Sequence, residues 1–194
     1  MNAAVGAMEQ MPMNEMTVKM LLETGSITKL LEAMRHAPND TELLLKVVRV
    51  LGRMSINDDL KQNIVESGGI ELVLWCMTGK VFSFLFFLFF FLTFVFNFFF
   101  ELFFFFLFFL FFLISSAHPS HALLMAACCT ALANFAFNSP EYSAAIVQKD
   151  GISNIENVMQ MNETEDRVLA NALQVLSNLM FQNDAHKKAI CLGK

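Results

Sequence analysis

The chain has little of what marks an enzyme, a secreted protein or a nucleic-acid binder. Four cysteines in 194 residues form no Cys-x-x-Cys pair, and no secretory leader pattern opens the chain, so a reducing, cytoplasmic setting is expected. The net charge of −5 gives no basic signature for nucleic acid. Neither a Gly-x-x-x-x-Gly-Lys loop nor a His-Glu-x-x-His pair occurs. We therefore predict no enzymatic activity, with no catalytic residue, cofactor or metal site.

Glycine is scarce as well, with eight residues, and its positions are informative. Glycine lets a chain leave a helix through a left-handed turn without a steric penalty. Similar breaks recur as LETGSITK, VESGGIEL, VQKDGISN and ICLG, which aligns Gly25, Gly68, Asp150 and Gly193 at spacings of 43, 82 and 43. A period of about 40 to 47 residues is typical of helical repeat proteins.

A second marker supports the same register. The leucines Leu51, Leu132 and Leu176 lie on the third predicted helix of each repeat, at spacings of 81 and 44. Both markers place a surplus of about 38 or 39 residues in the middle repeat. This surplus must lie between Met77 and His121.

Apolar residues at helical spacing and polar capping residues predict an all-α chain. The first helices of the repeats are expected over 16–25, 58–66 and 141–149, the second over 27–36, 70–77 and 152–161, and the third over 40–55, 121–136 and 165–180. Residues 1–15 are a tail or the remnant of an earlier repeat. The repeats then cover 16–57, 58–140 and 141–183, with an insert over 79–117, and 184–194 begin a truncated fourth repeat.

The insert contains a run of 34 residues, Val81 to Ile114, of which 20 are Phe and 7 are Leu. Its length exceeds the roughly 20 residues of a membrane-spanning helix. However, it has no Ala or Gly for close helix packing and no Trp or Tyr for the interfaces, and Asn97 and Glu101 lie near its middle. Phe, Leu, Val and Ile all have T at the second codon position. Translated T-rich non-coding sequence, such as a retained intron, is therefore one interpretation, and a membrane segment is the other.

The repeat unit resembles the armadillo family. The resemblance lies in the Gly-Gly-Ile junction and in a long third helix with a Leu-x-Asn-Leu-like signature, which reads LANF (Leu132 to Phe135) and LSNL (Leu176 to Leu179). In the first repeat the signature is LGRM, where Arg53 replaces the Asn. The resemblance covers residues 16–194 apart from the insert. It implies an armadillo-type α-solenoid, a right-handed superhelix of three-helix repeats whose third helices line a concave groove.

In armadillo proteins, the third-helix Asn typically holds the backbone of an extended peptide, because an amide both donates and accepts hydrogen bonds. Residues three, four and seven positions apart share a helix face. The resemblance thus predicts a peptide-binding groove whose candidate residues are Lys46, Arg49, Arg53, Thr130, Asn134, Asn171, Gln174 and Asn178.

The ligand is expected to be acidic. Nuclear-import members of the family carry a Trp four residues before the Asn, but this chain has Arg49, Thr130 and Gln174 there, which disfavours a basic ligand. A row of Lys46, Arg49 and Arg53 suits carboxylate or phosphate. The expected function is a protein–protein interaction scaffold in the cytoplasm with a protein partner and no nucleic acid. The alternative is a membrane-anchored helical protein with residues 81–114 as one span or a hairpin.

Overall fold

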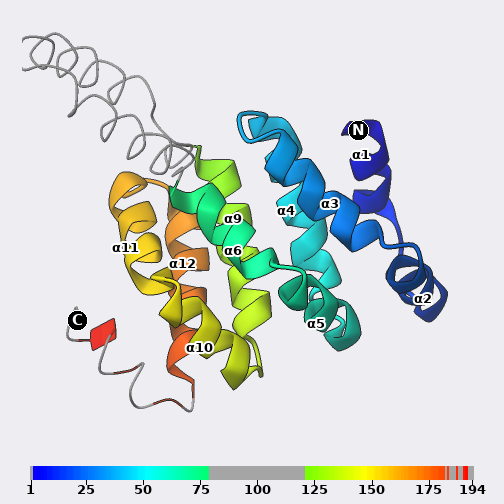
Figure 1. Ribbon diagram of the computed structural model, residues 1–194. Coiled ribbons are helices and arrows are strands. Elements are labelled where there is room, and N and C mark those ends of the chain that lie inside the picture. The colour runs from blue at the N-terminus through cyan, green and yellow to red at the C-terminus, as the bar shows by residue number, and fades with distance from the viewer. Residues whose placement is uncertain (1, 79–120, 182, 184–186, 188–189, 192–194) are drawn as a thin grey trace, which may run out of the picture.

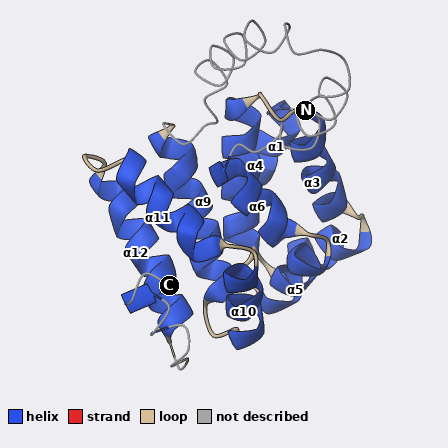
Figure 2. Cartoon of the chain, turned by 60° about the vertical axis from the view of Figure 1, so that its left-hand side comes forward, coloured by secondary structure: helices blue, strands red, loops and turns tan. Residues whose placement is uncertain are grey.

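The computed structural model of the chain describes residues 2–78, 121–181, 183, 187, 190 and 191. Within these residues every regular element is a helix, and no strand occurs (Figure 2). The predicted all-α class is confirmed. The predictions that concern the Phe-rich run, the rest of the insert over 79–117, and most of the expected fourth repeat fall outside the described residues.

The described helices follow the expected order closely. Their bounds are α1 (Asn2–Gln10), α2 (Glu15–Glu23), α3 (Ser26–His36), α4 (Thr41–Met54), α5 (Asp58–Glu66), α6 (Gly69–Thr78), α9 (Ala122–Ala136), α10 (Pro140–Gln148), α11 (Gly151–Met161) and α12 (Asp166–Met180). After α1, a short helix, a helix of ten or eleven residues and a long helix recur three times along the chain. The members of these triplets are α2–α3–α4, α5–α6–α9 and α10–α11–α12.

Helices α4 and α9 begin at side chains that satisfy otherwise unpaired backbone N–H groups, whereas Glu165 at the start of α12 makes no such bond. The Asp40 carboxylate accepts a hydrogen bond from Leu43 N at 2.9 Å, at the start of α4. At the start of α9, the His121 ring nitrogen Nδ1 accepts one from Leu124 N at 3.3 Å. These two caps lie 81 residues apart, which is the spacing of the leucine markers on the same helices.

The breaks between the first and second helices place one residue in the left-handed region each time. Gly25 has φ +62°, Gly68 has φ +89° and Asp150 has φ +58°. These are the three aligned break positions that lie within the described residues. Because L-residues rarely adopt this conformation, the shared backbone geometry explains why glycine recurs there.

The long helices lie side by side in a row. Helix α9 packs against both α4 and α12, and α1 packs against the other side of α4 (Figures 1 and 2). The marker leucines Leu51, Leu132 and Leu176 are all buried in the core beneath this row. Helix α6 also contacts α9, although residues 79–121 separate the two in sequence.

Helix α1 is an addition to the sequence prediction, which left residues 1–15 without a helix. Its Val5 is buried, whereas Ala4 and Ala7 are exposed. The buried apolar stripe on α1 is thus narrow, so the hydrophobic periodicity of the segment is weak. Contact with α4 buries one side of α1, which the hydrophobic pattern of α1 alone does not predict.

No helix in the described parts of the chain combines the length and the apolar character needed to cross a membrane.

Candidate functional site

The predicted site residues lie on α4, α9 and α12, the three adjacent long helices. Thr130 and Gln174 are exposed, and the other members are partly buried (Lys46, Arg49, Arg53, Asn134, Asn171 and Asn178). The structure therefore brings the three predicted rows onto neighbouring helices, each facing at least partly to solvent.

Each residue two positions after a marker leucine donates a hydrogen bond to the preceding long helix or its end. Asn134 Nδ2 donates to the Gly52 carbonyl at 2.8 Å, and Asn178 Nδ2 donates to the Ala133 carbonyl at 2.8 Å. Arg53 donates in the same direction, to the Met11 carbonyl at 3.0 Å. These three bonds form a ladder, here called the donor ladder, that links α12 to α9, α9 to α4, and α4 to the residue after α1.

The donor ladder uses part of the capacity of each amide. An Asn side chain has two N–H donors and an acceptor oxygen. Among the described residues, Asn134 Oδ1 accepts no hydrogen bond, while Asn178 Oδ1 accepts one from Gln174 Nε2 at 3.0 Å. Each Asn can therefore hold its neighbouring helix and still offer a polar group to a ligand.

A second link joins α12 to α9 nearer the start of the helices. Asn171 Nδ2 donates to the Ala126 carbonyl at 3.0 Å and contacts Thr130 Oγ1 at 2.9 Å. The Thr130 hydroxyl itself donates to the Ala126 carbonyl at 2.9 Å. Asn171 and Thr130 are thus held by each other, and this pair contributes to packing as well as to the exposed surface.

The three cations on α4 differ in their surroundings. Lys46 Nζ lies 2.5 Å from Glu42 Oε1, one helical turn away, and Arg49 lies 3.7 Å from Glu9 Oε1 of α1. Arg53 has no carboxylate within ion-pair distance among the described residues and donates to a neutral carbonyl instead. Two of the charges are therefore already compensated, and Arg53 remains the uncompensated one.

Sequence reasoning missed a row of exposed apolar side chains beside the donor ladder. Ile56, Phe137 and Phe181 each lie five residues after a marker leucine and are all exposed. Their shared register was available in the sequence, but each looks like an isolated apolar residue in a loop. Exposed apolar residues that recur in register indicate a contact surface more strongly than single ones do.

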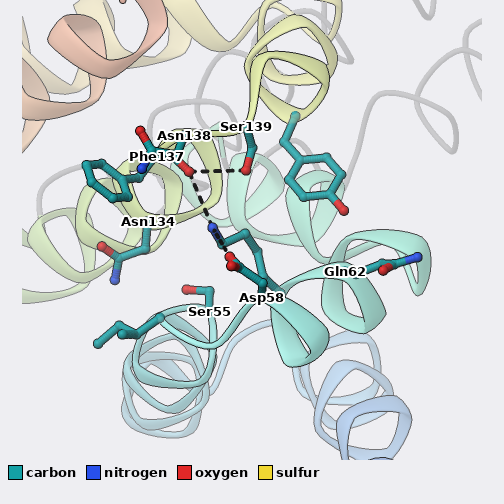
Figure 3. A pocket seen from close by; sticks show the side chains of 10 residues that line it. Ser55, Asp58, Gln62, Asn134, Phe137, Asn138 and Ser139 are labelled. Atoms are coloured by element: carbon teal, nitrogen blue, oxygen red, sulfur yellow. Dashed lines mark hydrogen bonds and ion pairs between the residues drawn. The ribbon is translucent and has the colours of Figure 1, made fainter.

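A pocket of about 600 Å³ adjoins this row where the end of α4 faces the end of α9. Its lining includes Asn134 and Phe137 from the α9 side, Ser55 and Ile56 after α4, and Tyr142 from α10. In Figure 3, Asn134 and Phe137 lie near each other at one side of the pocket. One member of the donor ladder and one exposed aromatic ring thus share a hollow.

A buried lysine forms part of this pocket. The Lys61 side chain is 5% exposed, and its Nζ lies 3.0 Å from Asp58 Oδ1. The same ammonium donates to the Phe137 carbonyl at 3.3 Å (Figure 3). A buried charge needs partners; the ion pair with Asp58 lies within α5, and the hydrogen bond to the Phe137 carbonyl ties α5 to the end of α9. We assign Lys61 a structural role here.

The described residues hold little that could carry a reaction. Burial raises the pKa of the Cys129 thiol to about 12, so its reactive thiolate form is scarce at neutral pH. The pKa of Cys128 is also raised, by its hydrogen bond with Cys76 and by burial. In the part of the chain that the structure describes, no group of three or more His, Cys, Asp or Glu side chains could hold a metal ion.

Comparisons with protein-family models, with curated proteins and with solved structures found no match to this chain.

Proposed function

We propose that the chain is a non-catalytic protein–protein interaction scaffold of the armadillo type, which binds an extended peptide across α4, α9 and α12. The observation that carries this proposal is the donor ladder, which orients amide side chains at one register position of adjacent helices. Amides that are already anchored need little further ordering to bind a ligand, so less conformational entropy is lost on binding.

The spacing of the helices suits an extended ligand. Packed helices lie about 8–10 Å apart, and an extended chain rises about 3.3 Å per residue. Each long helix therefore corresponds to roughly three ligand residues. The amides of Asn134 and Asn178 would contact the peptide backbone, and Ile56, Phe137 and Phe181 would contact apolar side chains of the ligand.

An acidic ligand is the second part of the proposal, and Arg53 is its main determinant. Lys46 and Arg49 already face Glu42 and Glu9, so their net attraction for a carboxylate is reduced. Arg53 has a planar donor group that binds carboxylate or phosphate in a bidentate manner. It lies in register with Asn134 and Asn178, so a ligand on the ladder would reach it.

The test uses an array of extended peptides in which acidic, neutral and basic members have the same length and the same apolar residues. The full chain, reconstituted in lipid nanodiscs, is applied to the array. We expect the acidic peptides to bind best. Replacing Asn134 and Asn178 with Ala should weaken every class, because backbone contacts do not depend on ligand sequence.

The substitution Arg53→Glu should weaken the acidic class selectively, by about tenfold or more, since one unfavourable charge contact exceeds roughly 1.4 kcal/mol. Lys19→Glu on α2 is the matched control, because Lys19 is an exposed lysine away from the rows. Equal binding by the wild type and the Asn134→Ala, Asn178→Ala variant would refute the peptide site.

A membrane-anchored protein is the second candidate, and the 34-residue run of Val81 to Ile114 favours it. A continuous apolar segment of this length can span a bilayer. Extraction of cell membranes with alkaline carbonate tests this candidate. Full-length protein that stays in the membrane pellet supports an anchor, and full-length protein released to the supernatant rejects it.

A further inference from the structure

The outward face of α12 is exposed where the same face of α4 and of α9 is covered. Three residues before the marker leucine, Val48 of α4 and Cys129 of α9 are 0% exposed, but Leu173 of α12 is 56% exposed. Val48 lies one turn before Gly52, which Ala131 of α9 contacts, and Cys129 lies one turn before Ala133, whose carbonyl accepts a hydrogen bond from Asn178 of α12. On α4 and α9 the corresponding face packs against the next long helix. On α12 this face is exposed, with Leu173 at its apolar centre.

Two further positions show the same contrast. Ala126 and Ala133 on α9 are buried under α12, but the corresponding Ala170 and Ser177 on α12 are exposed. The Ala133 carbonyl accepts hydrogen bonds from Phe137 N within its own chain segment and from Asn178 across the interface. The Ser177 carbonyl accepts the matching bond from Phe181 N and has a second lone pair for a donor from another helix.

The two existing interfaces define what a helix must supply to cover this face. The covering helix brings a small or β-branched residue and, three positions later, a side-chain amide donor. In α9 these are Ala131 and Asn134, and in α12 they are Val175 and Asn178. Ala131 lies directly against Gly52 of α4, 3.5 Å from the point that a Cβ on this glycine would occupy.

Helix α1 has this pair on its free side. Ala7 and Gln10 are three positions apart and both exposed, while Val5 of α1 is buried. Gln10 also lies 43 residues before Arg53, the donor on α4, so it holds the donor position in the repeat register. The chain therefore has a receiving face at α12 and a matching covering helix at α1.

We propose that a second copy of this chain docks its α1 on the outward face of α12, with Leu173 buried at the centre of the contact. Gln10 of one copy donates to the Ser177 carbonyl of the other, as Asn178 donates to Ala133 within one copy. The contact continues the row of long helices from one molecule to the next. It is head-to-tail, so the same two faces can meet again between further copies and longer assemblies can grow.

The test is cross-linking in cells between two differently tagged full-length copies, both with the exposed Cys191 replaced by Ser. One copy carries Gln10→Cys and the other Ser177→Cys, and a short bismaleimide is added. We expect a dimer that carries both tags. Adding Leu173→Glu to the second copy should lower its yield at least about tenfold, because the charge would be buried without a partner.

Two matched controls make the result specific. Lys19→Cys in place of Gln10→Cys moves the thiol to exposed α2, and this pair should give only background. Met161→Glu changes another half-exposed apolar side chain and should leave the dimer yield unchanged. Since Leu173 is exposed within one copy, Leu173→Glu should keep the wild-type pattern in limited proteolysis.

Equal yields from the Lys19→Cys and Gln10→Cys pairs would overturn the proposal. So would a Leu173→Glu variant that cross-links like wild type, or a contact found only between identical Gln10→Cys copies. None of these outcomes depends on peptide binding.

Discussion

At the scale of single residues, the left-handed backbone conformation recurs at the breaks between helices even where the residue is not glycine. Gly25 and Gly68 adopt positive φ as glycine does readily, but Asp150 adopts φ +58° with a Cβ and makes no capping hydrogen bond through its side chain. A non-glycine residue pays roughly 1–2 kcal/mol for this conformation. Asp150 is therefore a point of local strain that the packing of α10 and α11 maintains.

Replacing Asp150 with Gly should stabilise the protein. Relief of the left-handed strain outweighs the greater backbone entropy of glycine in the unfolded chain, for a net gain of about 0.5–1 kcal/mol. Urea unfolding followed by circular dichroism measures the change. The reciprocal control is Gly25→Ala, where an added Cβ would meet nothing within 4 Å. It should destabilise by about 1 kcal/mol through backbone conformation alone; a Gly variant at 150 that is less stable than wild type contradicts the argument.

At the scale of elements, the donor ladder couples the long helices to one another. Asn178 joins α12 to α9 through a partly buried bond, whereas Gln174, one turn earlier, is exposed and, among the described residues, bonds only Asn178 itself. The two amides sit on one helix face but differ in whether they reach a second helix. Their removal should therefore have different consequences.

The substitution Asn178→Ala should destabilise the protein by about 1–2 kcal/mol, because a bond between helices is lost and the site is partly buried. Gln174→Ala is the matched control and should change the free energy of unfolding by less than about 0.5 kcal/mol, as exposed positions do. Both values come from chemical unfolding, and amide hydrogen exchange should show the loss of protection concentrated in α12. Equal effects of the two substitutions would mean that the bond across the helices adds nothing.

The helices were largely predictable from sequence, whereas the hydrogen-bond partners of their side chains on other helices were not. Leu51, Leu132 and Leu176 repeat along the chain, so their shared burial follows from spacing alone. The partner of Asn134 is the Gly52 carbonyl, 82 residues away. No pattern along the chain reports such a pairing, because it depends on how two helices are set against each other in space. Phe137 was missed for a related reason: its exposure is decided by the turn after α9.

At the scale of the whole molecule, the row of long helices is continuous although residues 79–121 separate α6 from α9 in sequence. Helix α6 ends at Thr78 and α9 begins at Ala122, yet the two contact each other. The corresponding connections in the other triplets, 37–40 and 162–165, are four residues long. The packing of α4, α9 and α12 therefore has the same order as it would with a short connection in the middle triplet.

We predict that residues 79–120 can be replaced by Ala-Pro-Asn, the sequence of residues 37–39, with the described fold retained. His121 would then take the place of Asp40, and both already cap the long helix that follows. The comparison protein replaces the same 42 residues with a Gly-Ser linker of equal length, so that only the loop length differs. Closing the shorter loop costs about 2 kcal/mol less entropy, and the short-loop protein should be more stable by about that amount.

Urea unfolding of both proteins measures this difference, and circular dichroism reports helix content. Each protein should unfold in one cooperative transition. The dependence of the unfolding free energy on urea should be equal for the two and the midpoints different, since both chains bury the same surface. If the short-loop protein instead aggregates or unfolds without cooperativity, α6 and α9 need more than a four-residue connection to pack as they do here. If the Gly-Ser protein failed as well, residues 79–120 would have a part in holding the long helices together, and a message lacking them would then encode an unstable protein.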